Sequence, residues 1–110
     1  MGRFVKGDVV VLPFPFSDLS NSKKRPAFVI TNLQGDDLIL CQITSQQHND
    51  SDSISLISQD FINGNLNKPS YIRPNRIFTA DERIISKKVG NVQSTKISEV
   101  ITKLIQIVQR

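Results

Sequence analysis

Three adjacent cations form the first place in this 110-residue chain where side chains could bind an anion and stabilise its charge. Lys23, Lys24 and Arg25 end a polar stretch and lead directly into Pro26. An arginine can hold a phosphate through two parallel hydrogen bonds, whereas a lysine acts as a point charge. Because the residue before a proline is driven toward an extended conformation, Arg25 has the most predictable direction. A solvated basic turn explains this segment equally well.

A pair of hydroxyl side chains is the second candidate. Thr44 and Ser45 end an apolar stretch and precede a polar one. Their hydroxyls could bind a phosphate oxygen or stabilise it as charge develops. The signal is weak alone, because threonine and serine end many strands, and Arg73 could equally be a surface charge on an outer strand.

Several other chemistries are excluded by what the chain lacks. It has no phosphate-binding loop, no dinucleotide-binding glycine motif and no HExxH. Cys41, the single cysteine, lies in an apolar run, where a thiol behaves as a small buried hydrophobe. His48, the single histidine, lies in a polar loop and is expected to be exposed. A structural zinc site is excluded, and the sequence predicts neither a metal nor a cofactor.

The overall composition predicts one small domain that spans residues 1–110. Its net charge of +4 fits an anionic partner such as a nucleic acid or an acidic protein tail, although composition alone slightly favours a solvated surface with a small positive excess. No apolar stretch reaches transmembrane length and no signal peptide is evident. We therefore expect a cytoplasmic protein without a membrane partner.

The elements that must position these residues are mostly strands. Short apolar runs between turn residues predict strands at 9–12, 27–30, 38–44, 54–57, 70–73, 76–79 and 84–86. Residues 34–37 have the composition of a hairpin turn, and 58–62 could form one helical turn. Pro74 is expected to separate two strands, and Gly90 to form a turn.

The last segment instead predicts a helix. Ser94 or Thr95 is a suitable N-cap, Lys96 is expected on the polar face, and an apolar stripe that we expect to pack on the core is made by Ile97, Val100, Ile101, Leu104, Ile105 and Val108. Many short strands followed by one helix predict a mainly β fold with a C-terminal α-helix, arranged as a small barrel.

Several motifs, taken in order, resemble the MazF/PemK toxins of bacterial toxin–antitoxin systems. They span nearly the whole chain: Gly7-Asp8-Val9-Val10, Phe14-Pro15-Phe16, Lys24-Arg25-Pro26-Ala27-Phe28-Val29-Ile30, Ile43-Thr44-Ser45-Gln46 and the stretch 70–79. Each motif alone is common, but their shared order is fairly specific. The resemblance implies a small SH3-like barrel with a C-terminal helix that works as a homodimer.

The resemblance also implies an activity, the metal-independent cleavage of single-stranded RNA at short sequences. The ribose 2′-OH attacks the adjacent phosphate and leaves a 2′,3′-cyclic phosphate and a 5′-OH. The family's catalytic arginine, which precedes a proline, falls on Arg25, and its catalytic threonine falls on Thr44. Arg25 would neutralise charge on the phosphorane and could supply a proton, and Thr44 would hold a non-bridging oxygen.

The remaining site residues follow from the same resemblance. Substrate binding is expected from Lys23, Lys24, Ser45, Gln46, Arg73 and Asn75. Asn75 stands where other members have an aspartate, and an asparagine cannot act as a general base. The expected partners are a single-stranded RNA substrate and a cognate antitoxin whose acidic tail covers the basic groove. The alternatives are a non-catalytic barrel that binds gyrase, RNA or protein, and an ordinary protein-contact module.

Overall fold

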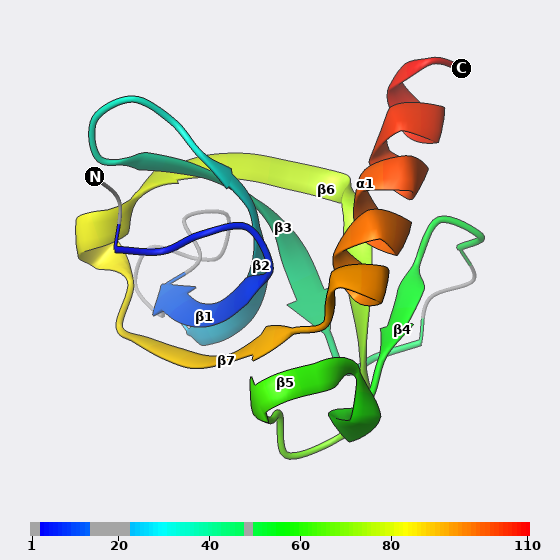
Figure 1. The fold of residues 1–110 in the computed structure, drawn as a ribbon, viewed down its shortest axis with the longest axis horizontal. Helices are drawn as coiled ribbons and strands as arrows, with labels where there is room; N and C mark the ends of the chain where they lie inside the picture. Colours follow the sequence, from blue (N-terminus) through cyan, green and yellow to red (C-terminus); the bar gives the residue numbers. More distant parts are fainter. Residues whose placement is uncertain (1–2, 14–22, 48–49) are drawn as a thin grey trace.

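The computed structural model describes residues 3–13, 23–47 and 50–110, and these form one antiparallel sheet with a C-terminal helix beside it (Figure 1). Within these residues the sheet has seven strands in the order β4-β6-β3-β2-β1-β7-β5. The strands are β1 (Asp8–Pro13), β2 (Lys24–Asn32), β3 (Asp37–Thr44), β4 (Ile54–Leu56), β5 (Phe61–Gly64), β6 (Ser70–Asp81) and β7 (Lys87–Val92), and the helix is α1 (Ser94–Val108). The predicted fold class is confirmed.

Two strands, β2 and β3, are buried on both faces, which explains their continuous apolar runs. Val29 and Leu40 point into one apolar cluster, which also takes residues from β1 and β6. Phe28 and Cys41 point into a second cluster, which Val100 of helix α1 covers. Burial raises the pKa of the Cys41 thiol well above its usual range, and the side chain is a small buried hydrophobe as predicted.

The apolar stripe of α1 packs on the core only along its first part. Val100 is fully buried, whereas Ile105 and Val108 are exposed. Figure 1 shows the C-terminal turns of α1 extending past β6. The prediction that the whole stripe packs on the core is therefore wrong for the last turns, because the sheet does not reach that far.

The start of α1 also differs from expectation. The N-cap is Gln93 rather than Ser94 or Thr95, and its side chain makes no capping bond. Its backbone N–H donates instead to Asp60 O (2.9 Å), which fixes where the chain enters the helix. Lys96, expected on the polar face, is buried. Its ammonium donates to Ser55 O (2.9 Å) and to Glu99 Oε1 (3.1 Å) and lies 3.6 Å from the Asp60 carboxylate, and these partners offset the loss of water.

Strand β6 is continuous where two strands were predicted. Pro74 does not end it, but it interrupts the pairing with β3: Cys41 pairs with Ile77, and the next residue, Gln42, pairs with Arg73. The residues between Arg73 and Ile77 form a bulge, since a proline has no N–H for the ladder. Because of this bulge, the single strand β6 pairs with β3 both before and after Pro74.

Further differences from the sequence-based expectations lie in the second half of the chain. The predicted strand at 84–86 is wrong, because a 3-10 turn, η3 (Glu82–Ile84), extends to Ile84 and the next strand starts only at Lys87. The Asp81 side chain caps this turn by accepting a bond from Arg83 N. The predicted helical turn is the 3-10 turn η2 (Ser58–Asp60), but β5 follows it directly. Gly90 lies within β7 and not in a turn, because its missing side chain lets β5 approach.

The predicted hairpin turn joins β2 to β3, and Gly35 has the positive φ (82°) that the turn requires. His48, the motif at 14–16 and most of the polar loop 17–24 lie outside the described residues. Within the described ranges, no helix is both long and apolar enough to cross a bilayer.

Gly64→Ala should destabilise the protein strongly. Gly64 has a φ of 77°, and a Cβ there would lie 1.9 Å from Val89 O of the neighbouring strand. Strain and overlap together should lower the free energy of unfolding by roughly 3 kcal/mol or more, as measured by chemical denaturation. The control is Gly35→Ala, which has a similar φ but nothing within 4 Å of the new Cβ, and should cost about 1 kcal/mol. Equal losses in the two variants would contradict this explanation.

Candidate nucleic-acid interface

A groove of about 500 Å³ lies where β2 begins and β3 ends. Both predicted catalytic residues and most of the predicted substrate-binding residues line it: Lys23, Lys24, Arg25, Thr44, Ser45 and Gln46. The other wall comes from the segment before β6 and includes Lys68. Residues that are far apart in the sequence therefore meet in one groove.

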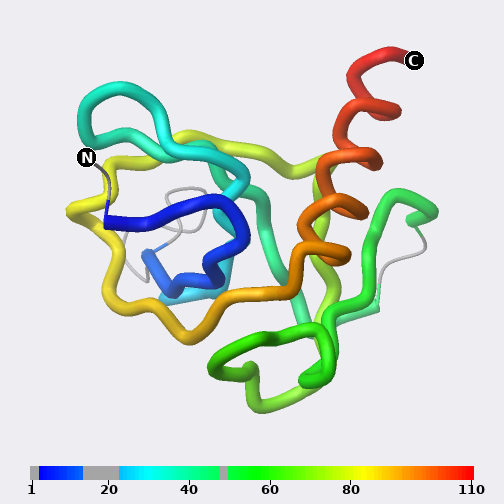
Figure 2. The backbone as a smooth tube through the Cα atoms, viewed as in Figure 1, coloured from blue at the N-terminus to red at the C-terminus, as the bar shows by residue number. Residues whose placement is uncertain are grey.

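Arg25 and Thr44 face each other across the β2–β3 pair. The two strands are antiparallel, and Ala27 pairs with Gln42. Arg25 lies two residues before Ala27, and Thr44 lies two residues after Gln42, so both lie on the same side of the sheet. Figure 2 shows the connecting β2–β3 turn (cyan) at the opposite end of these strands.

The guanidinium of Arg25 projects from a well-anchored position. Arg25 pairs with Leu12 of β1 on one edge of β2, and Leu12 is fully buried. The Arg25 side chain is exposed, so its backbone is fixed by the sheet while its charge faces solvent. This arrangement gives the charge a defined direction, as the proline after it predicts.

The groove is strongly positive. Lys23, Lys24, Arg25 and Lys68 make no ion pair with any carboxylate that the structure describes. No acidic side chain appears among the described residues of its walls. Uncompensated charges of one sign in a groove attract an anionic chain and raise its local concentration.

The Thr44 hydroxyl has a defined hydrogen-bonding role. Its Oγ1 accepts a bond from Gln46 N (3.1 Å), which closes a small turn after β3. A hydroxyl that accepts in this way still carries its own hydrogen, which can donate to a ligand oxygen. The turn also keeps Ser45 and Gln46 at the rim of the groove.

Arg73 and Asn75 lie apart from the groove lining and meet at Asp50. Asp50 Oδ2 accepts from Arg73 Nη2 (3.2 Å) and from Asn75 Nδ2 (2.9 Å). The backbone N–H of Asp52, followed by these two side chains, lowers the pKa of Asp50 to about 2. The charge of Arg73 is thus compensated within the protein, and the predicted role of Arg73 and Asn75 in substrate binding stays a prediction.

Asp50→Asn should destabilise the protein at neutral pH but not at pH 2. The folded state lowers the pKa of Asp50, so its contribution to stability is complete above the unfolded value of about 4 and is lost as the pH falls toward 2. Thermal melts between pH 7 and pH 2 should show the gap between the two proteins closing. The control is Asp37→Asn, at an exposed carboxylate beside the β2–β3 turn. A gap that does not depend on pH would contradict the assignment.

One cation of the groove, Lys68, was not predicted from the sequence. Lys68 precedes Pro69 just as Arg25 precedes Pro26, and this repeated step of a cation before a proline was the available signal. The segment 65–69 has no apolar periodicity to place it next to β2. Only the fold shows that Lys68 lines the same groove as Lys23, Lys24 and Arg25.

Comparisons with known proteins place the chain in a family and identify its fold. The family model of PemK-like, MazF-like toxins of type II toxin–antitoxin systems matches residues 5–108. A sequence search of curated proteins finds no match. Among solved structures, a MazE-MazF structure from Deinococcus radiodurans has a TM-score of 0.77 at 18% identity and covers 96% of this chain and 95% of its own.

Two mycobacterial structures are similar as well. An endoribonuclease in complex with its cognate antitoxin from a mycobacterial species has a TM-score of 0.75 at 13% identity, with 96% of this chain and 94% of that chain covered. The Mycobacterium tuberculosis toxin MazF-mt6 has a TM-score of 0.72 at 14% identity, with 93% and 96% covered. At these identities the likeness establishes the shared fold.

Proposed function

We propose an endoribonuclease activity for this chain, which belongs to the family of PemK-like, MazF-like toxins of type II toxin–antitoxin systems. The observation that carries the proposal is the placement of Arg25 opposite Thr44 in a groove whose described walls are basic and free of carboxylates. A flexible, single-stranded phosphodiester fits such a groove, because its backbone charge meets the uncompensated cations. The mycobacterial neighbour that is an endoribonuclease supports the same activity.

The groove suggests how its residues would act. The ribose 2′-OH gives up its proton to water and attacks the adjacent phosphorus, the bond to the 5′ oxygen breaks, and that oxygen takes up a proton from water or from Arg25. A 2′,3′-cyclic phosphate and a 5′-OH remain. Arg25 stabilises the extra negative charge of the phosphorane, and the Thr44 O–H donates to a non-bridging oxygen. Asp50 does not line the groove, and its pKa of about 2 leaves it little affinity for a proton, so it is not assigned the role of general base. Charge stabilisation by Arg25 and Thr44 is the contribution that the described groove supports.

Incubation of the purified protein with a long single-stranded RNA in EDTA tests the activity. The expected products carry 2′,3′-cyclic phosphate and 5′-OH ends, which can be mapped by ligation-based sequencing of the 5′-OH fragments. Products with 5′-phosphate ends would overturn the proposed chemistry. An RNA that is bound but not cut would instead support a non-catalytic binding module of the same fold.

The expected protein partners follow from the same site. We infer that a cognate antitoxin covers the basic groove with an acidic segment, since the four cations that line it need compensation in a neutralised complex. The mycobacterial structure with its cognate antitoxin supports this pairing. A homodimer and a cytoplasmic location are inferred from the family resemblance.

Lys68→Gln should weaken RNA binding in a salt-dependent way. Each phosphate contact made by a cation adds to the counterions released on binding, so the loss of one contact should lower the slope of log affinity against log salt by about 0.7. Fluorescence anisotropy of a labelled RNA between 50 and 300 mM salt measures this slope. Lys6→Gln, an exposed lysine before β1 and outside the groove lining, is the charge-matched control. An equal effect of both substitutions would show that only net charge matters.

A further inference from the structure

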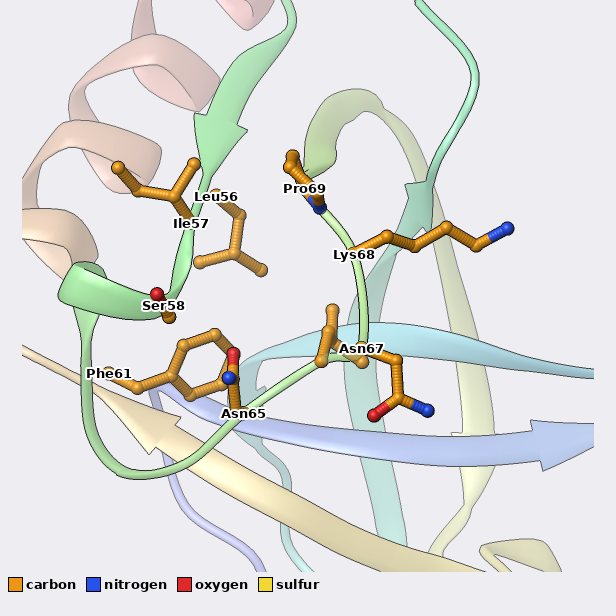
Figure 3. Close-up of a pocket in the computed structure, with 9 residues that line it drawn as sticks. Leu56, Ile57, Ser58, Phe61, Asn65, Asn67, Lys68 and Pro69 are labelled. Carbon is orange, nitrogen blue, oxygen red and sulfur yellow. The ribbon is translucent and has the colours of Figure 1, made fainter.

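A second, smaller pocket opens beside the basic groove (Figure 3). Its volume is about 160 Å³, which suits a single planar ring better than a drug-sized molecule. Its walls come from the segment that joins β4 to β5 and from residues 65–69, which precede β6. Leu56 and Phe61 form an apolar floor, because both are buried in the cluster under helix α1.

The pocket and the groove share one wall. Leu66, Asn67 and Lys68 line both of them, so a ligand that lies along the groove passes the mouth of the pocket. Figure 3 shows Lys68 extending away from Leu56 and Phe61, with its ammonium on the far side of the shared wall. The cation is thus directed away from the pocket floor, and the pocket itself is left to neutral groups.

Beside the Ser58 hydroxyl, the lining of the pocket holds two side-chain amides with no partner in the described structure. The side chains of Asn65 and Asn67 make no hydrogen bond to another described residue. The backbone of Asn65 is nevertheless fixed, because its N–H donates to Val89 O (3.3 Å) directly after Gly64. A side-chain amide offers both a donor and an acceptor, which is what the edge of a nucleobase requires.

From these features we propose that the pocket takes one unstacked nucleobase of an RNA whose backbone lies in the basic groove. The apolar floor receives the ring, and the Asn65 amide, which lies beside Phe61 in Figure 3, reads its polar edge. Proteins recognise single-stranded RNA in this way, by unstacked bases held between apolar contacts and hydrogen bonds. The inference rests on the proposed function only in that the groove holds RNA, and it does not need the RNA to be cut.

A nucleobase fits these features better than an apolar side chain of a bound protein. A leucine or a phenylalanine would use the floor but would leave the Asn65 amide without a partner in the complex, which weakens binding. A base uses the floor and this amide together. Its phosphates would also lie within reach of the cations on the other side of the shared wall.

Binding of 2′-O-methyl RNA decamers tests the proposal, because such decamers lack the attacking hydroxyl and cannot be cut. The probes are A₁₀, C₁₀, U₁₀ and an abasic decamer, each measured by anisotropy with the wild type, Asn65→Ala, Ser58→Phe (which narrows the pocket) and Gln34→Ala. Gln34→Ala removes an exposed amide in the β2–β3 turn and is the control. Thermal melts check that each variant is folded.

The wild type and Gln34→Ala should bind their best decamer at least roughly 10-fold more tightly than the abasic one. Asn65→Ala and Ser58→Phe should reduce this ratio by about 5-fold while binding the abasic decamer as before. An unchanged ratio in both pocket variants would overturn the proposal. A second result would also overturn the proposal. In that result, an acidic decapeptide with one leucine would compete with U₁₀ for binding to the wild type but would not compete for binding to Asn65→Ala. If the wild type shows the base dependence but never cuts RNA, the proposed activity fails and the pocket assignment stands.

Discussion

Arg25→Ala should slow RNA cleavage drastically and leave the barrel folded. Arg25 is exposed and makes no ion pair with a described carboxylate, so its side chain contributes little to stability. In the proposed reaction it meets the charge that develops on the phosphorane. Loss of such a contact should slow cleavage by about 1,000-fold or more. Single-turnover cleavage of an end-labelled RNA measures the rate, and a thermal melt checks the fold.

Two further variants separate the proposed role of Arg25 from general attraction. Arg25→Lys keeps the charge but loses the two-pronged hydrogen bonding, and should retain a rate between those of the wild type and Arg25→Ala. Lys6→Ala removes an equal charge outside the groove lining and should change the rate by less than about 3-fold. If Arg25→Ala cuts RNA at the wild-type rate, the site is wrongly assigned. If all three variants lose activity equally, Arg25 acts only through net charge.

The strands that carry the site could be predicted because their sequences obey simple rules. β2 and β3 are buried on both faces, and burial on both faces produces the continuous apolar runs from which they were predicted. Arg25 was singled out by the proline that follows it. Its pairing with Thr44 came from the family resemblance, because no local rule sets the register between two separate strands.

The features that sequence reasoning missed all depend on contacts between distant residues. Asp50 meets Arg73 and Asn75 across 23 and 25 positions of the chain, and its loop has no pattern that announces this. Lys96 fits the polar face of its helix by periodicity, but Asp60 offers its ammonium a partner inside the fold. Local sequence propensity carries no information about such partners, because they come together only after the sheet has formed.

Thr44→Val should lower the cleavage rate by about 100- to 1,000-fold. The substitution keeps the shape of the side chain and removes the hydroxyl that is proposed to hold a non-bridging oxygen. Binding of an uncleavable RNA should change much less than the rate, because the contact gains strength as charge develops on the phosphorane. Thr44→Ser keeps the hydroxyl and should stay within about 10-fold of the wild type.

The double variant tests whether the two residues act as one unit. Groups that stabilise the same phosphorane lose their effects in a non-additive way, so Arg25→Ala/Thr44→Val should be little slower than Arg25→Ala alone. Fully multiplied losses would mean that the two residues act on different steps. The Thr44 Oγ1 also accepts a hydrogen bond from Gln46 N (3.1 Å), and Thr44→Val removes that bond as well. If Thr44→Val weakens the binding of uncleavable RNA by the same factor as it slows cleavage, Thr44 shapes the groove rather than taking part in the reaction.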